Sequence, residues 1–295
     1  IYYPSGKPHM GHAYSSISAD FIARYKRLEG YDVTFVTGTD EHGQKIQKSA
    51  DKRKLSPDIF CNEISKVFLD LTKTLNLSNT DFIRTTEIRH HKTVQKLWNI
   101  LEKKKFIYLS KYSGWYSVSD EAFYTESEII EKDNIKLCEA SGSVVEWVEE
   151  ESYFFKLSEF QNLLIKHYED NPEFIQPSSR RNEVMSFVKS GLNDLSVSRN
   201  SLKWGISVPN SKDHIVYVWL DALTNYLTAT NYFDENFSWP ADVHIIGKDI
   251  LRFHAVYWPA FLLAAEIPLP KTIFGHGWIL SGDEKMSKSK GNILD

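Results

Sequence analysis

The sequence predicts an α/β protein, in which a doubly wound parallel sheet is split by an inserted α+β segment. Two observations carry this prediction. Helical apolar patterns alternate with short β-rich runs before residue 106 and again after residue 210. The segment between these stretches has a different character, with short strand-like runs, turns and two short helices. The length of 295 residues fits one large domain or two ordinary ones.

Composition excludes several classes of protein. A hydrophobic fraction of 42% is enough to fill a sizeable core, which argues against disorder. Two Cys exclude a disulfide scaffold and favour a reducing compartment, so we expect a cytoplasmic protein, with an organellar matrix as the alternative. The net charge of −4 does not indicate a general nucleic-acid coat. No apolar run reaches the roughly 18–20 residues of a membrane span, so we expect no membrane partner.

The first half is predicted to contain three helices and two strands. A short apolar run at residues 1–3 and a β-branched run at 33–37 are the strands. Apolar residues recur at helical spacing over 11–29, Pro57 follows a capping Ser56, and a third helix covers 87–105. The chain opens on Ile1 without an initiator Met, and we interpret it as a trimmed fragment.

The remaining elements repeat the alternation. Two short helices are predicted at 158–168 and 180–189. After residue 210 the predicted order is strand, helix, strand, helix, strand, over the ranges 215–218, 221–230, 243–246, 249–263 and 272–274. Short strands separated by helices are typical of parallel pairing.

The first motif is His9-Met10-Gly11-His12, at the predicted first strand-to-helix crossing. The free N–H groups of a helix N-terminus attract phosphate, and a glycine allows close approach of a ligand. His9 and His12 are three residues apart, so both rings can face one side and donate to phosphoryl oxygens. The alternative is that both histidines only cap the helix.

The second motif is Lys285-Met286-Ser287-Lys288-Ser289-Lys290-Gly291-Asn292. Its closely spaced lysines, with intervening Ser and a following Gly, make a flexible cationic loop. Such a loop can close over a polyphosphate. The alternative is a solvated basic turn.

The two motifs together resemble the double signature of the class I aminoacyl-tRNA synthetases, and the chain is most similar to the methionyl-tRNA synthetases among them. Further similar segments are 1–9, 37–43, 218–223 and 247–254. The resemblance implies a Rossmann-like catalytic domain in two halves, at 1–106 and 211–280. It also implies a connective-peptide insertion at 107–210 and the start of a stem-contact region at 281–295. The family's anticodon-binding domain is absent from these residues.

The resemblance implies a methionine pocket. Asp40 would bind the substrate ammonium group, and apolar and aromatic walls would surround the thioether. The residues implied to bind methionine are Ile1, Tyr3, Asp40, Trp219, Ala222, Leu223, Tyr226, Ile250 and His254. Taken without the family, the Trp and Tyr residues are better explained by core packing, and His254 by a satisfied core histidine.

It further implies an ATP site and a two-step reaction. The residues implied to bind ATP are Gly11, Gly247, Asp249, His276, Ile279 and Lys288. His9, His12, Lys285 and Lys288 would act catalytically while methionine attacks the α-phosphorus of ATP, with Mg²⁺ bridging the departing pyrophosphate. The methionyl group would then pass to tRNA(Met), and we expect a monomer. Asp249 as a simple helix cap remains an alternative.

Many members of this family hold zinc in the insertion through Cys-x-x-Cys pairs. The corresponding positions here are Ser117, Asp120, Cys138 and Ser141, so one thiol remains. We predict no zinc and no other resident metal, and we expect aromatic packing to hold the insertion together.

Three rival interpretations remain open. One is a sister class I synthetase for valine, isoleucine, leucine or cysteine. However, the insertion leaves little room for an editing domain, and the cysteine enzyme would be expected to carry zinc-binding thiols. Another is a small nucleotidyltransferase, although such chains are usually shorter. The last is a non-enzymatic paralogue, which would be expected to lose one of the two motifs.

Overall fold

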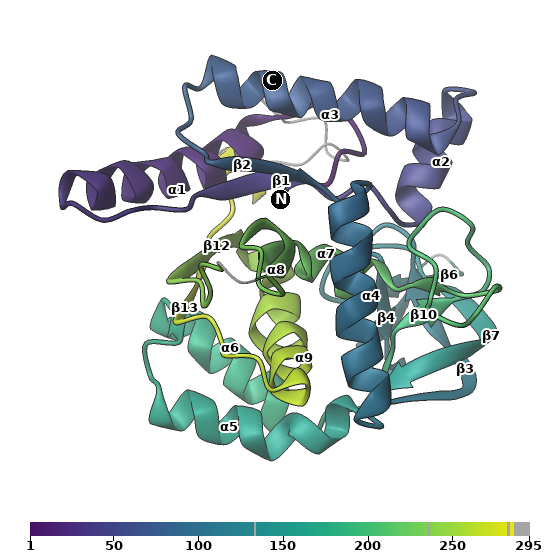
Figure 1. The fold of residues 1–295 in the computed structure, drawn as a ribbon. Coiled ribbons are helices and arrows are strands. Elements are labelled where there is room, and N and C mark those ends of the chain that lie inside the picture. The colour runs from purple at the N-terminus through teal and green to yellow at the C-terminus, as the bar shows by residue number, and fades with distance from the viewer. Residues whose placement is uncertain (133, 235–236, 282–283, 286–295) are drawn as a thin grey trace.

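The computed structural model describes residues 1–132, 134–234, 237–281 and 284–285 (Figure 1). Its parallel strands form two groups. In the first half, β1 (Val36–Thr39) pairs with β2 (Asp81–Arg84), and Tyr2 adds a parallel bridge to Thr39. In the second half, the order is β12 (Val243–Gly247), β13 (Thr272–His276) and β8 (Ile175–Gln176), all parallel. The predicted parallel α/β architecture is confirmed.

Four helices accompany the first half, of which three were predicted. They are α1 (Met10–Leu28), α2 (Gln44–Lys52), α3 (Pro57–Thr74) and α4 (Ile88–Lys103). Neither α2 nor β2 was predicted from the sequence, because each is short and only part of it is apolar. Figure 1 shows α3 running along one side of the β1–β2 pair. Phe60, Ile64 and Phe68 of α3 are buried there, as the apolar spacing predicts.

The apolar stripe that identifies α1 faces outward. Phe21 is 71% exposed and Leu28 87%, whereas Ser16, Asp20 and Ala23 are the buried residues of this helix. Asp20 accepts hydrogen bonds from the backbone and side chain of Ser78, both at 2.6 Å, and so fixes the inner face. Periodicity therefore predicted the helix correctly but not the face that packs.

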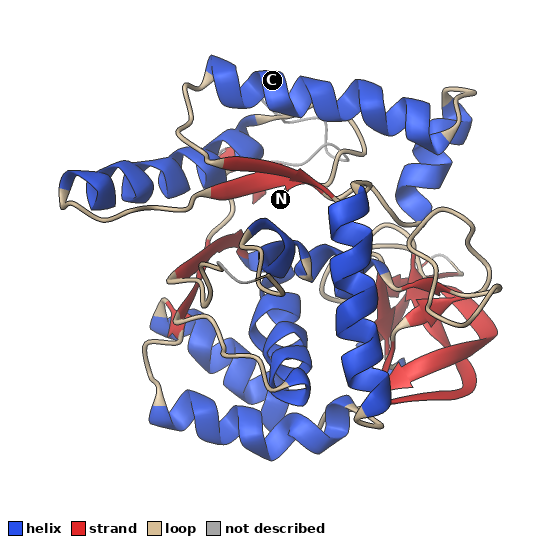
Figure 2. Cartoon of the chain, in the orientation of Figure 1, coloured by secondary structure: helices blue, strands red, loops and turns tan. Residues whose placement is uncertain are grey.

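The insertion is built around an antiparallel sheet in the order β4-β3-β7-β9 (Figure 2). Its strands are β3 (Ile107–Ser117), β4 (Ala122–Tyr124), β7 (Glu146–Phe155) and β9 (Leu195–Ser196), and a separate hairpin joins β5 (Ile129–Lys132) to β6 (Ile135–Cys138). The rings of Trp115 and Trp147, which are register partners, meet edge to face at 5.2 Å. Short 3₁₀ turns cover Glu126–Glu128 and Leu157–Phe160.

Two details differ from the expected strand pattern. Within 107–210, β8 hydrogen-bonds to β13 of the second half, and it lies between α5 (Gln161–Asp170) and α6 (Ser178–Lys189). The run at 215–218 is not a parallel strand. Its β11 (Ile215–Val216) pairs antiparallel with β10 (Ser198–Arg199), because the chain returns from the insertion in the opposite direction. The domain boundaries themselves stay a prediction.

The second half contains the most buried helices. They are α7 (Val218–Leu223), α8 (Asn225–Ala229), a 3₁₀ turn at Lys248–Ile250, a π-helical turn at Phe253–Tyr257 and α9 (Trp258–Ala265). The predicted helix at 249–263 is thus one continuous path of changing pitch. The chain continues into β14 (Leu280–Ser281) and β15 (Glu284–Lys285). No helix among the described residues is long and apolar enough to cross a membrane.

Close packing within the sheet requires a glycine at one point. Gly38 of β1 pairs with Ile83 of β2, and a Cβ at Gly38 would lie 1.9 Å from the Ile83 carbonyl oxygen. Any larger residue would push the two strands apart at the end that carries Asp40.

Candidate active site

The two histidines of the first motif begin α1. Nδ1 of His9 accepts from the backbone N–H of Gly11 at 3.1 Å, and Nδ1 of His12 accepts from the backbone N–H of His9 at 3.0 Å. These bonds form a reciprocal cap and place the rings 4.0 Å apart. A Cβ at Gly11 would lie 2.9 Å from Cε1 of His9, so glycine lets the ring fold back. Both histidines therefore cap the helix through Nδ1, as the alternative interpretation of the motif expects.

The carboxyl ends of β12 and β13 lie against α1. Nε2 of His276 is 2.7 Å from the Ser15 hydroxyl, and Gly247 is the register partner of His276. A Cβ at Gly247 would lie 2.8 Å from Oδ1 of Asp249. Four predicted ATP residues, Gly11, Gly247, Asp249 and His276, therefore border one region at the start of α1.

The structure says little about the second motif. Lys288 lies outside the described residues, and for Lys285 it describes only the backbone, in β15. Ile279 follows Trp278, over whose ring the Lys248 ammonium lies at 3.5 Å. The predicted roles of Lys285, Lys288 and Ile279 stay predictions.

Three consecutive buried polar residues follow β1, and their side chains differ in their hydrogen-bond partners. Glu41 forms a bidentate ion pair with Arg84 of β2, at 2.8 and 2.9 Å. His42 contacts Asp221 of α7, with Nδ1 2.6 Å from Oδ2. Asp40 is 8% exposed, and no residue in the described part of the chain donates a hydrogen bond to its Oδ1. Of the three, Asp40 therefore offers an unused acceptor.

Electrostatics at Asp40 favour a cationic ligand. Burial raises the pKa of Asp40 well above its usual range, and the nearby Asp221 and Glu121 raise it further. The nearby backbone N–H of His42 acts in the opposite direction and lowers the pKa of this carboxyl. A positively charged ligand would supply the partner that favours the ionised form of Asp40.

An aromatic wall stands on α7, α8 and the π-helical turn. The rings of Trp219 and Phe253 stack at 3.7 Å, and the Tyr226 hydroxyl is 2.8 Å from Nε2 of His254. Burial lowers the pKa of His254 to about 3, so its ring is neutral near pH 7. Ala222 and Leu223 also lie on α7, and Ile250 ends the 3₁₀ turn that precedes the π-helical turn. Ala222, Leu223 and His254 are buried.

Tyr3 and Ile1 reach the same region from the first strand. The Tyr3 hydroxyl lies 3.2 Å from the His42 carbonyl oxygen and 3.1 Å from Oε1 of Glu121. Ile1 lies near both Asp40 and His254. The predicted methionine-binding residues thus converge on the ends of β1 and α7.

Glu121 of the insertion also lies in this region, and it was not predicted from the sequence. Its Oε1 accepts from the backbone N–H of Lys45 at 2.8 Å, and its Oε2 accepts from Tyr116. The carbonyl oxygen of Glu121 also accepts from Tyr217 at 2.7 Å. No sequence signal marks Glu121, because its partners lie on distant parts of the chain.

The four former zinc positions come together around one carboxylate. Asp120 accepts hydrogen bonds from Ser141 at 2.6 Å, Ser143 at 2.7 Å and Tyr124 at 2.8 Å. The Ser117 hydroxyl is 3.3 Å from the Asp120 backbone N–H, and Cys138 is buried beside Tyr124. A hydrogen-bond network centred on the Asp120 carboxylate therefore occupies these positions. The absence of zinc stays a prediction.

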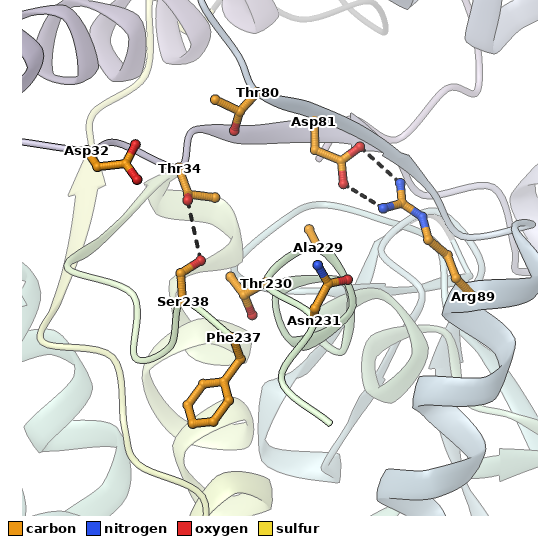
Figure 3. A pocket seen from close by; sticks show the side chains of 10 residues that line it. All are labelled: Asp32, Thr34, Thr80, Asp81, Arg89, Ala229, Thr230, Asn231, Phe237 and Ser238. Atoms are coloured by element: carbon orange, nitrogen blue, oxygen red, sulfur yellow. Dashed lines mark hydrogen bonds and ion pairs between the residues drawn. The ribbon is translucent and has the colours of Figure 1, made fainter. Parts of the chain in front are cut away.

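A large polar cavity of about 570 Å³ lies elsewhere (Figure 3). Asp32, Thr34 and Asp81, at the amino ends of β1 and β2, contribute to its lining. The Arg89 guanidinium pairs with Asp81 across its edge at 2.7 Å. Since Asp40 follows the carboxyl end of β1, the cavity and the candidate site are at opposite ends of the strands.

A family model described as class I tRNA synthetases (M) matches residues 1–295. The chain belongs to the methionyl family of the class I tRNA synthetases. Curated methionine–tRNA ligases are similar along the whole of this chain. The identity is 56% over 299 residues for Rickettsia conorii, 55% over 301 for Rhizobium meliloti and 53% over 307 for Listeria monocytogenes.

Solved structures of this family are also similar. Methionyl-tRNA synthetase of Mycobacterium tuberculosis bound by methionyl-adenylate has a TM-score of 0.97 at 51% identity, covering all of this chain and 59% of that one. The apo form of the same enzyme has a TM-score of 0.81 at 49% identity, covering 94% of this chain and 54% of that one. The family's split α/β catalytic fold is therefore the fold of this chain.

The chain is shorter than these relatives. It spans 58% of the Rickettsia and Rhizobium sequences and 46% of the Listeria sequence. Because the similarity covers the whole of this chain, the matched stretch includes both of its sequence motifs.

Proposed function

We propose that this chain activates L-methionine with ATP to form methionyl-adenylate, and that the whole protein transfers the methionyl group to the 3′ end of tRNA(Met). The observation that carries the proposal is the buried Asp40 carboxyl, whose Oδ1 has no donor among the described residues. It lies at the junction of the aromatic wall and the start of α1. An amino acid has the ammonium group that such a carboxylate requires.

The side chain of the substrate would lie against the wall formed by Trp219, Tyr226 and His254. Nδ1 of His254 is 3.0 Å from the Ile250 carbonyl oxygen, which can only accept, so Nδ1 carries the proton. Nε2 then accepts from the Tyr226 hydroxyl at 2.8 Å. A thioether sulfur is soft and polarisable, so it suits aromatic walls with a polar tip. An apolar pocket alone distinguishes two similar substrate side chains by only about 1–3 kcal/mol of binding free energy.

The adenosine and phosphates would lie between the start of α1 and the ends of β12 and β13. Asp249 would accept from the ribose hydroxyls, and His276 and Ile279 would border the base. The methionine carboxylate attacks the α-phosphorus and pyrophosphate leaves, so the reaction needs no protein nucleophile. His9 and His12 would donate from Nε2 to the crowded phosphorus centre, and Lys285 and Lys288 would neutralise the leaving group.

Magnesium would arrive with the nucleotide. Within the described ranges, no group of three or more His, Cys, Asp or Glu side chains could hold a metal ion. This suits Mg²⁺, which is commonly held by substrate phosphates and water rather than by an all-protein cage. When bound, it would neutralise charge on the pyrophosphate oxygens.

Amino-acid-dependent ATP–pyrophosphate exchange, run with the full amino-acid panel, tests the proposal. Exchange with methionine alone is expected. Exchange driven by valine, isoleucine, leucine or cysteine would instead identify a sister enzyme. A nucleotidyltransferase or a non-enzymatic paralogue would show no amino-acid-dependent exchange. Aminoacylation of tRNA(Met), assayed with the full-length protein, tests the second step.

A further inference from the structure

A buried polar network joins three parts of the chain beside the amino-acid site. Asp221 of α7 accepts from His42 on one oxygen, at 2.6 Å, and from His90 of α4 on the other, at 2.7 Å. Nδ1 of His90 is 2.9 Å from the Thr228 hydroxyl of α8. Asp221 and His90 are 0% exposed and His42 is 2% exposed. Figure 1 shows α4 standing beside α7 and α8, which this network ties together.

Asp221 is ionised in this network. Burial by itself would raise the pKa of Asp221, but the adjacent imidazole of His42 and the hydrogen bonds from His42 and His90 outweigh it and bring that pKa to about 2. Two directional bonds therefore hold both carboxylate oxygens. A charge buried in this way contributes little net stability compared with apolar packing, so its value lies in the geometry that it imposes.

That geometry bears directly on the site. The backbone N–H of His42 lies near the Asp40 carboxyl, two residues earlier in the chain, while the His42 ring holds Asp221. Asp221 lies on α7 between Trp219 and Ala222, two of the proposed wall residues. One residue therefore contacts the ammonium-binding carboxyl with its backbone and the helix of the thioether wall with its side chain.

We propose that His42, with Asp221 and His90, is a positioning device that sets the distance between Asp40 and the methionine-side-chain wall. This inference rests on the proposed amino-acid site, and it adds residues that do not themselves touch the substrate. Loosening the network displaces α7 relative to the turn after β1. Methionine then cannot bind Asp40 with its ammonium group and the aromatic wall with its side chain at the same time. The nucleotide region around Gly247 and His276 is not affected.

The test uses substitutions that keep or remove one N–H group. In His42→Asn the amide nitrogen replaces Nδ1, and in His42→Ala the donor is lost. With the full-length protein, His42→Ala should raise the methionine KM in ATP–pyrophosphate exchange by about tenfold or more, since tenfold corresponds to about 1.4 kcal/mol. The ATP KM should stay within about twofold, and His42→Asn should recover most of the loss.

Controls separate positioning from general damage. His214 is also buried, and its Nδ1 is 3.0 Å from the Ser198 hydroxyl, away from this network. His214→Ala should lower the melting temperature and leave the methionine KM unchanged. A role in folding alone would give His42→Ala and His42→Asn the same methionine KM, or would raise both substrate KM values together, and either result overturns the proposal.

A second pair covers the case in which His42→Ala does not fold. His90 donates through Nε2, whose place the amide of His90→Gln can take, while His90→Leu removes the donor. The Gln variant should keep a lower methionine KM than the Leu variant, and equal values would refute the inference. If the wild type exchanges with another amino acid, the proposed function fails, and the same variants test the network with that amino acid.

Discussion

The Tyr226 hydroxyl donates to Nε2 of His254, because the Ile250 carbonyl oxygen fixes the proton of this ring on Nδ1. His254 comes from the π-helical turn and Tyr226 from α8, so the bond also joins two elements. His254 is neutral because it is buried, and the Tyr226 hydroxyl is its hydrogen-bond partner. Substitutions in this wall should therefore change both the stability of the fold and the binding of methionine.

Acid should weaken the fold through His254. The unfolded residue takes up its proton near pH 6.5, whereas the folded residue does so only near its lowered pKa of about 3. The unfolded state therefore binds more protons in between, and the free energy of unfolding falls as the pH falls. His254→Gln should reduce the loss between pH 7.5 and 5.5 by about 1.4 kcal/mol. Urea melts at the two pH values measure this, with Tyr226→Phe as a control that keeps the titrating ring.

Removing the stacked indole should weaken methionine binding. Trp219→Ala deletes the ring that packs on Phe253, so the methionine KM should rise by roughly tenfold to a hundredfold, as loss of about 1.5–3 kcal/mol of apolar burial implies. Steady-state exchange kinetics measure both KM values. Trp147→Ala, an exposed indole of the insertion, is the matched control. An unchanged methionine KM in Trp219→Ala would count against the pocket.

His12 and Lys288 should act on the chemical step. His12→Ala and Lys288→Ala should each lower kcat for ATP–pyrophosphate exchange by about 10²-fold or more, in line with the loss of one transition-state donor. Because Nδ1 of His12 also caps α1, His12→Ala should in addition cost about 1 kcal/mol of stability. Ser18→Ala on the outer face of α1 is the control. Near-wild-type exchange rates in both variants would refute the catalytic roles of His12 and Lys288.

The insertion should fold without zinc. Metal analysis of chelator-treated, folded protein should find no stoichiometric zinc, and one zinc per chain would refute the prediction. Asp120→Ala removes the shared acceptor of Ser141, Ser143 and Tyr124, and should destabilise the protein by roughly 1–3 kcal/mol. Thermal melts measure this, and Ser119→Ala, an exposed neighbour, should have little effect.

The residue pattern was enough to predict those features of the fold that depend on residues close together in the sequence. The start of α1, the Pro57 start of α3 and the strand-to-helix motifs were predicted because each depends on a few consecutive residues. The same holds for Asp40, whose position after a buried strand places it at the carboxyl edge of the sheet. Motif spacing, joined to a family resemblance, then indicated the chemistry.

Tertiary structure decided what depends on direction and distance. The antiparallel pairing of β11 and the outward face of α1 follow from how the chain returns, which periodicity does not encode. Glu121 reaches Tyr3 from 118 positions away, and His42 reaches Asp221 from 179 away. Most of the elements, their order and the reactive motifs could be predicted from the residues alone. Which buried charges meet depends on the folded chain, because an ionised carboxylate is costly in the interior unless donors, here from distant positions, converge on it.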